Sequence, residues 1–375
     1  MKIVIASDSF KGSLTSNEVA AAATRGIKAV YPDCHVVAVN VADGGEGTVE
    51  AVVEALHGQI ISVQVSDPLG RPIQARYGIA GQTAIMEMAA ASVLPLFSPH
   101  ERNPWLTSTH GTGEMIMDAI QKGCRNFLIG IGGSATNDAG TGMLQAMGFR
   151  FYDAQGQEIP HCTGGTMHLI ARIDDSAVPQ CVHESSFTIA CDVDTPFCGK
   201  EGAAPVFAPQ KGADAQMVQR LDAGMASLAQ VIQNKYHVNI VPIAGAGAAG
   251  GMGGAFRAFL GATLKKGIDM VLDAIDFDTT IQGANLIITG EGKVDFQTAK
   301  GKTAAGVLNR AKKQHIPVVA IGGCVEMCDS LVQMGFAGIY PILEEKVPLE
   351  VAMQREFAMS NVTKTVARIL SSGVC

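Results

Sequence analysis

Short apolar runs that end in small or acidic residues alternate along this chain with segments of helical periodicity. The run "KIVIASDS" at 2–9 is followed by a helical pattern over 16–30, then by "VVAVNVADGG" at 36–45 and by a second helical pattern over 47–57. This alternation is typical of βαβ units, in which each helix returns the chain so that the next strand runs parallel to the last. The sequence therefore predicts an α/β protein built on a parallel sheet.

The first predicted helix has clear boundaries. Thr15 and Glu18 have the spacing of a capping box, in which each side chain bonds to the other residue's backbone N–H. An apolar stripe at helical spacing follows, formed by Val19, Ala23, Ile27 and Val30. Pro32 marks the end of the helix, so the segment 16–30 is expected to pack one face against the sheet.

The same pattern returns in "NFLIGIGGSATND" at 126–138 and in the later runs "ANLIITGEG", "PVVAIGG" and "AGIYPI", and we expect these apolar strands in one buried sheet. The stretches between them are rich in alternating runs or in Gly, Pro and Cys. We predict a Rossmann-like (flavodoxin-like) parallel-sheet domain over 1–60, 105–150 and 260–375. A mixed α/β domain inserted over 61–104 and 151–259 completes the chain, with the active site expected in the interdomain cleft.

Charge and composition exclude several classes of protein. Lys and Arg number 28 against 35 Asp and Glu, a net charge of −7 without blocks of like charge, which argues against a nucleic-acid partner. The nine cysteines are scattered and odd in number, as is usual for reduced thiols. No apolar run approaches the roughly 18 residues of a membrane span. We expect a cytoplasmic protein with no membrane partner, and the sequence leaves a homo-oligomer open.

Acidic residues stand where the predicted strands end. These residues are Asp8, Asp43, Glu46, Asp138, Asp192, Glu291 and Asp295. Each alone can be a turn or helix-cap residue, but ligands of open parallel sheets bind beyond the carboxyl ends of the strands. Lysines accompany the acids in "DSFKGS", "FAPQKGA", "GEGKVD" and "AKGKT". Carboxylates, ammonium groups and exposed backbone amides together suit a nucleotide bound with Mg²⁺.

Two familiar nucleotide motifs are incomplete or misplaced. Gly245-x-Gly247-x-x-Gly250 matches the dinucleotide fingerprint, but it lies late in the chain instead of opening the first βαβ unit. "GKT" at 301–303 lacks the first glycine of a P-loop, because Phe296 occupies that position. The glycine-rich stretch 245–254 is interpreted as a phosphate cradle, with tight packing or a hinge as the alternative.

The motifs taken together resemble the type I glycerate kinases, in matching order over almost the whole chain. They are "DSFKGSLTSNEVA", "VADGGEGTVEA", "EMAAASVL", "THGTGEMI", "GIGGSATNDAG", "FAPQKGA", "GAAGGMGGA" and "ITGEGKVDFQTAKGKT". The resemblance implies two α/β domains and ATP-dependent phosphorylation of D-glycerate to 2-phosphoglycerate. A 3-phosphoglycerate product, or a non-catalytic two-domain protein that binds hydroxy acids, remain the alternatives.

Roles follow from the needs of phosphoryl transfer. Asp192 is our first candidate for the general base and Asp138 the second, and Lys11 and Lys211 are expected to neutralise phosphate or carboxylate charge. Glu291 and Asp295 are the predicted Mg²⁺ ligands. The predicted nucleotide- and phosphate-binding residues are Gly132, Gly133, Ser134, Thr136, Gly250, Gly251, Gly253, Gly254, Gly290, Gly292 and Lys293. The predicted substrate contacts are Asp8, Ser9, Asp43, Glu46 and His110.

Overall fold

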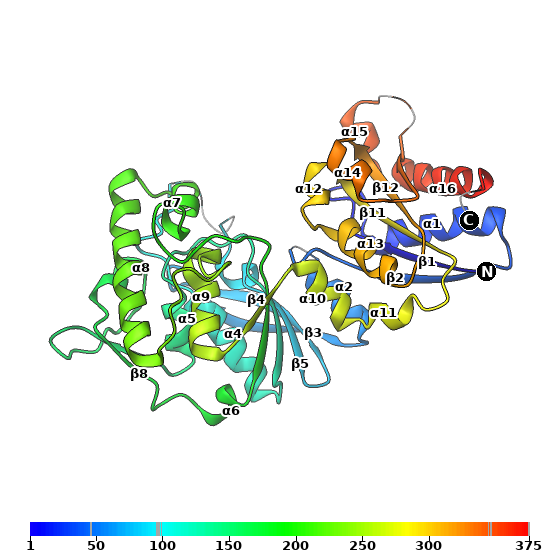
Figure 1. Ribbon diagram of the computed structural model, residues 1–375. Helices are drawn as coiled ribbons and strands as arrows, with labels where there is room; N and C mark the ends of the chain where they lie inside the picture. Colours follow the sequence, from blue (N-terminus) through cyan, green and yellow to red (C-terminus); the bar gives the residue numbers. More distant parts are fainter. Residues whose placement is uncertain (46, 95–97, 99, 344, 346, 374–375) are drawn as a thin grey trace. The chain divides into compact units, whose positions relative to one another are not determined.

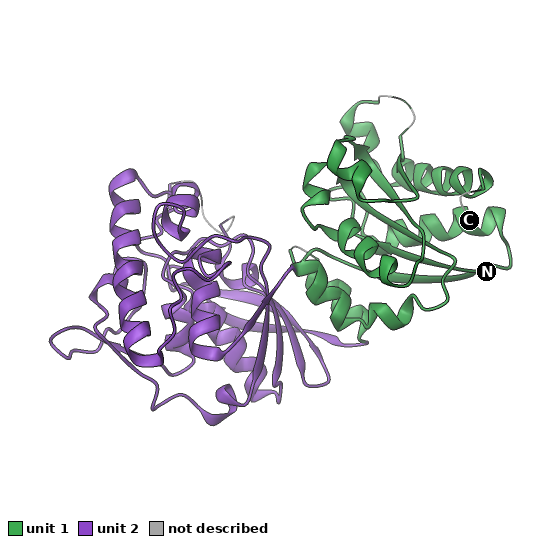
Figure 2. Ribbon diagram, viewed as in Figure 1, with its two compact units in different colours: residues 1–56, 267–375 green, residues 57–266 purple. Residues whose placement is uncertain are grey.

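The computed structural model describes residues 1–45, 47–94, 98, 100–343, 345 and 347–373. The chain forms two compact units (Figure 2). Unit 1 comprises residues 1–56 and 267–375, and unit 2 comprises the continuous segment 57–266. Unit 2 is therefore an insertion between two parts of the chain that together build unit 1.

The segment 105–150 does not belong where the sequence placed it. Its strand β6 (Asn126–Gly130) pairs with β5 (Thr83–Glu87) and β9 (Ser186–Ala190), so the whole segment lies in unit 2. The run "NFLIG" is as apolar as the strands of unit 1, and this likeness led to the incorrect assignment. Strand pairing depends on partners far away in the sequence, which an apolar run does not identify.

Unit 1 is an α/β layer structure whose strands and helices alternate along the chain (Figure 1). Its elements are β1 (Lys2–Ser7), α1 (Ser16–Val30), β2 (His35–Asn40), α2 (Thr48–Ala55), α10 (Gly267–Ala274), α11 (Phe277–Thr280), β11 (Leu286–Val294), α12 (Phe296–Ala299), α13 (Thr303–Lys313), β12 (Val318–Val325), α14 (Asp329–Gln333), β13 (Gly338–Pro341), α15 (Leu349–Ala352) and α16 (Arg355–Ser371). The capping box of α1 forms as predicted, with Thr15 N donating to Glu18 Oε2 at 2.9 Å.

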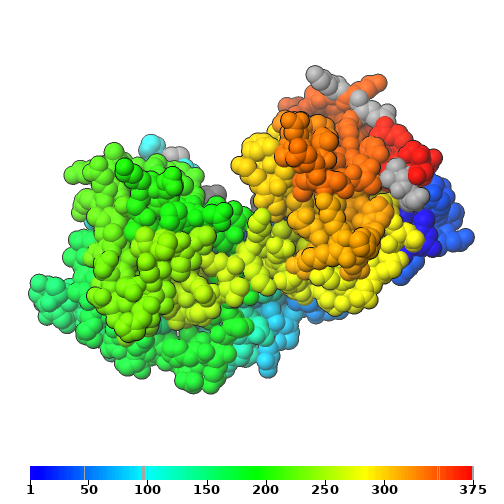
Figure 3. Space-filling view, viewed as in Figure 1, coloured from blue at the N-terminus to red at the C-terminus, as the bar shows by residue number. Residues whose placement is uncertain are grey.

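The five strands of unit 1 are all parallel and lie in the order β13-β12-β11-β1-β2. Alternate residues of β1 face opposite sides, so Ile3 and Ile5 pack in the core with α1 and α16, whereas Val4 and Ala6 pack with α10, α11 and α13. The N-terminal and C-terminal segments lie side by side (Figure 3) because α1 packs on α16. A Cβ atom at Gly26 would lie 2.5 Å from Thr363 O, so glycine allows this close approach.

Unit 2 also layers helices on a sheet. Its elements are β3 (Gln59–Ser66), β4 (Pro72–Ala80), β5, α3 (Ala89–Ser92), α4 (His110–Gln121), β6, α5 (Thr141–Ala146), β7 (Arg150–Tyr152), η2 (Met167–Leu169), β8 (Arg172–Asp174), α6 (Gln180–His183), β9, α7 (Ala203–Phe207), η3 (Pro209–Lys211), α8 (Ala215–Tyr236), α9 (Ala248–Leu260) and β10 (Thr263–Lys265). The six-stranded sheet has the order β10-β9-β6-β5-β4-β3, and β7 and β8 form a separate antiparallel pair. Among the described strands of the larger sheet, only β4 runs in the opposite direction, because it pairs antiparallel with both β3 and β5.

Strand register brings the polar strand ends of each unit to one edge. In unit 1, Ser7 of β1 is level with Gly290 of β11 and with Asn40 of β2. The chain leaves β1 toward β2 on one side, while β11, β12 and β13 lie on the other, so a topological switch point lies between β1 and β11. In unit 2, Gly130 of β6 is level with Ala190 of β9. The predicted fold class, a Rossmann-like parallel-sheet domain with an inserted mixed α/β domain, is confirmed.

Candidate active site

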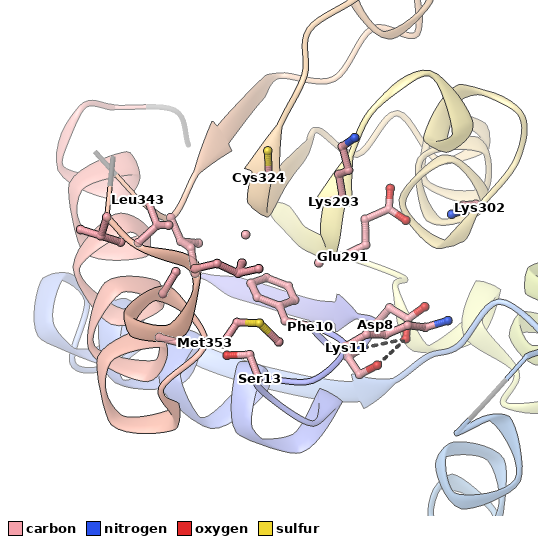
Figure 4. Close-up of a pocket in the computed structure, with 18 of the residues that line it drawn as sticks. Asp8, Phe10, Lys11, Ser13, Glu291, Lys293, Lys302, Cys324, Leu343 and Met353 are labelled. Carbon is pink, nitrogen blue, oxygen red and sulfur yellow. Dashed lines mark hydrogen bonds between the residues drawn. The ribbon is translucent and has the colours of Figure 1, made fainter. Parts of the chain in front are cut away.

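A pocket of about 500 Å³ opens in unit 1 beyond the carboxyl ends of the strands (Figure 4). Asp8 follows β1, Glu291 and Gly292 belong to β11, Cys324 belongs to β12, and Leu343 follows β13. The pocket therefore lies at the switch point between β1 and β11, where open parallel sheets bind ligands. Its volume is in the usual range for small-molecule sites.

One end of this pocket is acidic. Asp8 and Glu291 line it and are only 7% and 6% exposed, and Asp43 lines the same end. Asp8 Oδ1 accepts a hydrogen bond from Ser9 N at 2.6 Å, and Asp8 Oδ2 accepts one from Thr303 Oγ1 at 2.8 Å. Glu291 Oε1 accepts a hydrogen bond from Thr298 Oγ1. The two buried carboxyl groups are thus held in place by neighbouring residues.

Crowding and burial disfavour the charged forms of these carboxyl groups. Burial raises the pKa of Glu291 to about 7, with Asp8 and Asp43 acting in the same direction and Thr298 and Lys302 opposing. Burial and then the charge of Asp43 also raise the pKa of Asp8. A cation or a hydrogen-bond donor brought by a ligand would relieve this repulsion. Such raised values are typical of functional sites.

Lysines stand around the same end. Lys11 and Lys302 line the pocket, and Lys302 lies close enough to favour the charged form of Glu291. Lys293 also lines it, with its Nζ atom 2.9 Å from Glu326 Oε1 and 3.4 Å from Asp295 Oδ2, and the hydrogen bond with Glu326 raises the pKa of Lys293. Lys302, which was visible in the run "AKGKT", differs from Lys293 because it stands near Glu291 in the pocket, whereas Lys293 is paired with Asp295 and Glu326.

Asp295, predicted as a metal ligand, is the N-cap of α12. Its Oδ1 atom accepts a hydrogen bond from Gln297 N at 2.8 Å, and its own N–H donates to Thr298 Oγ1 at 3.1 Å. The structure therefore favours the helix-cap role over the metal role for this residue. Within the described ranges, no group of three or more His, Cys, Asp or Glu side chains is arranged to hold a metal ion by itself.

The opposite end of the pocket is apolar. Phe10, from the turn after β1, and Met353, from the segment after α15, lie side by side here, and Leu343 lies beyond the end of β13 (Figure 4). The remaining apolar lining comes from Ile342, Val347, Leu349, Ala352 and Ala358. These residues could not be selected from the sequence, because apolar side chains in this C-terminal segment carry no signal that separates a ligand pocket from a core.

In unit 2, Asp138 is completely enclosed after β6. Asp138 Oδ2 accepts hydrogen bonds from Thr109 N at 2.8 Å, Thr109 Oγ1 at 2.7 Å and Gly142 N at 3.1 Å, while Oδ1 accepts one from Gly140 N at 3.2 Å. Asp138 is 0% exposed, and burial raises its pKa against these hydrogen bonds. The carboxylate therefore joins the loop after β6 to the start of α4, a positioning role.

Lys211 is buried beside the same loop. Its Nζ atom donates to Ser134 Oγ at 2.7 Å and to Thr136 O at 2.6 Å, and the residue is only 1% exposed. Burial lowers the pKa of Lys211 to about 7, although the charge of Asp138 opposes this shift. The structure thus brings together Lys211, Ser134, Thr136 and Asp138, which the sequence had singled out separately.

Arg102 is a candidate that sequence reasoning missed. Its backbone packs against Gly212, where a Cβ atom would lie 2.2 Å from Arg102 O, so Arg102 is adjacent to the Lys211 segment. The Nε atom of Arg102 is buried and has no hydrogen-bond partner among the described residues. An unpaired guanidinium N–H is suited to an anionic ligand. No motif surrounds Arg102, so its role could not be found without coordinates.

Asp192 and His110 occupy accessible positions in unit 2. Asp192 is exposed, two residues after β9, and is on the same sheet edge as the exposed Gly132 and Gly133 after β6. His110 begins α4, and its Nε2 atom lies 3.7 Å from Glu114 Oε1. Glu46, another predicted contact, lies outside the described residues.

The glycine-rich stretch 245–254 is packed inside unit 2, which contradicts its interpretation as a phosphate cradle. A Cβ atom at Gly250 would lie 2.2 Å from Thr136 O, and one at Gly251 would lie 2.8 Å from Ala139 Cα. Gly253 and Gly254 are also buried. A Cβ atom at Gly253 would lie 2.2 Å from Gly245 O, and one at Gly254 would lie 2.7 Å from Phe197 Cδ2. The stretch "VNIVPI" before it is not a strand, so the dinucleotide fingerprint also lacks its structural context.

Gly290 and Gly292 occupy different environments in β11. Gly290 is buried, and its carbonyl oxygen accepts a hydrogen bond from Asp8 N at 2.9 Å. Gly292 lines the pocket, with Lys11 N 3.4 Å from the position of a Cβ atom. Ser9 lines the pocket as well. Gly292 and Ser9 are therefore placed to meet a ligand, whereas Gly290 supports β1.

Comparison with known proteins identifies a family. A sequence model described as the glycerate kinase family matches residues 3–372. Glycerate kinase of Bacillus cereus is 45% identical over 372 residues, which cover 98% of this chain and 97% of the relative. Glycerate 2-kinase of Escherichia coli is 44% identical over 375 residues, covering 98% of each protein.

A solved structure agrees with the fold. A crystal structure assigned to glycerate kinase 2 of Salmonella typhimurium LT2 superposes with a TM-score of 0.90 at 43% sequence identity, covering 99% of this chain and 98% of the other. Among the described helices, none is long and apolar enough to cross a membrane.

Proposed function

The chain belongs to the glycerate kinase family, and on that basis we propose that it phosphorylates the 2-hydroxyl group of D-glycerate with ATP and forms 2-phosphoglycerate. The observation that carries the proposal is the similarity along nearly the full length to the Escherichia coli protein named glycerate 2-kinase. Family membership makes the protein a kinase, a phosphotransferase with an alcohol group as acceptor. The position of the transferred phosphoryl group is the finer part of the proposal.

We assign the triphosphate to the charged end of the unit 1 pocket. Lys11 and Lys302 line this end and supply positive charge, and Ser9 and Gly292 offer a small side chain and an open backbone. Each hydrogen bond between a lysine and a phosphate oxygen contributes about 1.5–3 kcal/mol. These contacts compensate for the negative charge of the chain as a whole.

Mg²⁺ fits the acidic end of this pocket as a partner of the nucleotide. Asp8, Asp43 and Glu291 present hard oxygen atoms. Asp43 raises the pKa of Asp8, and both raise the pKa of Glu291, an effect that a divalent cation would reverse. Mg²⁺ in kinases is commonly held by one or two carboxylates, phosphate oxygens and water, so no preformed cage is required. Bound there, the ion would neutralise charge on the phosphate oxygens.

Asp192 is the proposed general base. The hydroxyl oxygen of glycerate forms a bond to the γ-phosphorus, the bond from that phosphorus to the leaving oxygen of ADP breaks, and the hydroxyl proton passes to Asp192. Asp192 is exposed to solvent, whereas the carboxylate oxygens of Asp138 are fully engaged in backbone and hydroxyl hydrogen bonds. Asp138 is therefore proposed to position the loop and not to accept the proton.

We assign the carboxylate of glycerate to Lys211 and Arg102. Lys211 Nζ has a third N–H besides those that meet Ser134 Oγ and Thr136 O, and Arg102 Nε has no described partner. A pair of cationic donors distinguishes a hydroxy acid from an uncharged alcohol. His110, at the accessible start of α4, is a further proposed substrate contact.

The proposal is tested by incubating the purified protein with MgATP and D-glycerate and measuring ADP. ³¹P and ¹³C NMR of the product then locate the phosphoryl group, and lactate, glycerol and L-glycerate are the control acceptors. ADP with D-glycerate and a phosphorus signal coupled to C2 are expected. Coupling to C3 would identify the enzyme as a 3-phosphoglycerate-forming kinase. Absence of ADP with every acceptor would instead favour a hydroxy-acid-binding protein.

A further inference from the structure

The unit 1 pocket changes character along its length. Its charged side chains, Asp8, Lys11, Glu291 and Lys302, gather at one end (Figure 4). Phe10, Leu343 and Met353 stand at the other, where the described lining residues are mostly apolar and the hydroxyl of Ser13 is a polar exception. A ligand that fills the pocket must therefore be highly charged at one end and able to pack against apolar side chains at the other.

The apolar end is held in place by the turn that follows β1. Phe10 N donates to Leu14 O at 2.8 Å, and Ser13 N donates to Phe10 O at 2.8 Å, so Phe10 belongs to a closed turn. Gly12 has a φ of +77°, and a Cβ atom there would lie 2.6 Å from Met353 Cε. Met353 therefore rests on this turn and brings the segment after α15 against the pocket. Phe10 and Met353 thus lie next to each other at the apolar end (Figure 4), and the turn holds both in place.

We infer that this apolar end is a nucleobase subsite that holds the base of the phosphoryl donor by packing between Phe10, Met353 and Leu343. The inference rests on the proposed function, since it takes a nucleoside triphosphate to be the donor. A planar base buries apolar area on both faces, and a phenyl ring and a thioether are favourable partners for such a surface. The pocket of about 500 Å³ has room for a nucleotide.

Recognition by packing has a consequence for donor specificity. Among the described side chains at this end there is no carboxylate or amide, and the buried Ser13 Oγ atom, which has no hydrogen-bond partner among the described residues, is a single rotatable hydroxyl that does not discriminate strongly between bases. Purine triphosphates that differ only in exocyclic groups are therefore expected to have KM values within about tenfold of one another, and pyrimidine triphosphates, which bury less area, to bind more weakly.

Cys324 provides a direct reporter of occupancy. It lines the pocket and is exposed, whereas Cys328, four residues later, is not among the lining residues. The experiment is alkylation of the whole protein with N-ethylmaleimide, followed by peptide mass spectrometry that compares Cys324 with Cys328. The probes are adenosine, inorganic tripolyphosphate and D-glycerate.

Adenosine is expected to slow alkylation of Cys324 at least about threefold and to leave Cys328 unchanged, and D-glycerate is expected to protect neither thiol. Protection by tripolyphosphate but not by adenosine would overturn the base subsite. So would protection by glycerate alone. If adenosine protects while the protein forms no ADP from ATP and glycerate, the subsite stands and the proposed function fails. If ADP forms but adenosine does not protect Cys324, the proposed function stands and the base subsite fails.

A pair of substitutions gives a second test. Met353→Glu places a carboxylate at the base end, while Met327→Glu introduces the same change at an exposed residue that does not line the pocket. Met353→Glu is expected to raise the KM for ATP at least tenfold with little change in the KM for glycerate, and Met327→Glu to change neither. Met353→Ala keeps the test valid if the glutamate variant does not fold. Unchanged ATP KM in a folded Met353 variant would contradict the inference.

Discussion

Lys211 Nζ donates a hydrogen bond to Ser134 Oγ across 2.7 Å inside unit 2, where both side chains are nearly inaccessible to water. A buried ammonium group is costly unless an anion compensates it, and the pKa of Lys211 falls to about 7 for this reason. The hydrogen bond holds the amine of Lys211 next to the loop after β6, whose Gly132 and Gly133 are exposed. This unfavourable burial supports the proposal that Lys211 binds the carboxylate of the substrate.

Replacing Lys211 by methionine separates these two effects. We expect Lys211→Met to lower kcat/KM for glycerate at least about tenfold, because one charged hydrogen bond contributes about 1.5–3 kcal/mol. The melting temperature is expected to stay level or rise at pH 6, since the variant no longer buries a charge. Lys200→Met, at an exposed position, is the matched control. A Lys211 variant that loses stability but keeps its kinetic constants would contradict this role.

The same residue predicts a pH dependence. The native pKa of about 7 lies below the unfolded value of 10.5, so the unfolded chain binds more protons between these values and stability rises with pH over that window. The charged form needed to bind a carboxylate decreases above pH 7, so kcat/KM for glycerate is expected to fall there. The test is a pH profile of kcat/KM for the wild type and for Lys211→Met. The variant should not show the fall above pH 7 if Lys211 binds the carboxylate.

Glu291 predicts the opposite dependence in unit 1. Its native pKa of about 7 lies above the unfolded value of 4.5, so its contribution to stability is present below pH 4.5 and is lost as the pH rises through 7. Glu291→Gln should therefore gain stability relative to the wild type between pH 5 and pH 8, on the order of 1–3 kcal/mol. Thermal melts at both pH values test this, with the highly exposed Glu356→Gln as control. If the stability difference between Glu291→Gln and the wild type is the same at pH 5 and pH 8, the raised pKa of Glu291 is ruled out.

Asp192 and Asp138 should respond differently to amide substitution. Asp192→Asn is expected to lower kcat by about 10²–10⁴ and to change the melting temperature less than Asp138→Asn does, because Asp192 is exposed and Asp138 is buried. Asp138→Asn should lower the melting temperature, because an amide cannot accept all the hydrogen bonds that the carboxylate receives from Thr109, Gly140 and Gly142. Near-normal turnover of folded Asp192→Asn would remove it as the base.

The glycine-rich stretch offers a comparison between packing and backbone strain. Gly250 has a φ of +67° and a Cβ position 2.2 Å from Thr136 O, whereas Gly261 has a similar φ of +61° with nothing within 4 Å. Alanine at Gly261 should cost only about 1–2 kcal/mol for the left-handed backbone. Alanine at Gly250 should cost clearly more and disturb the loop that carries Ser134. Equal melting temperatures for the two variants, with a raised ATP KM only for Gly250→Ala, would restore the phosphate cradle.

Local features of the fold could be predicted from the sequence. The boundaries of α1 at 16 and 30 follow from the capping box and the apolar stripe, which are interactions between residues close in the chain. Asp8 and Glu291 could be selected because strand ends are recognisable and parallel strands bring their ends to one edge. The order of the motifs indicated the family, and the match of the family model to residues 3–372 confirms this membership.

Other features were decided only by the tertiary structure. The sequence could not show that β6 pairs with β5 and β9, that Asp295 caps α12, or that Gly250 packs on Thr136. Nor could it show the buried unpaired Nε atom of Arg102. Each of these depends on which distant residues meet and which polar atoms remain unpaired. Helical periodicity and helix caps depend on residues close in the chain and can be predicted from the sequence. Burial, strand pairing and shifted pKa values arise from contacts between segments that are far apart along the chain.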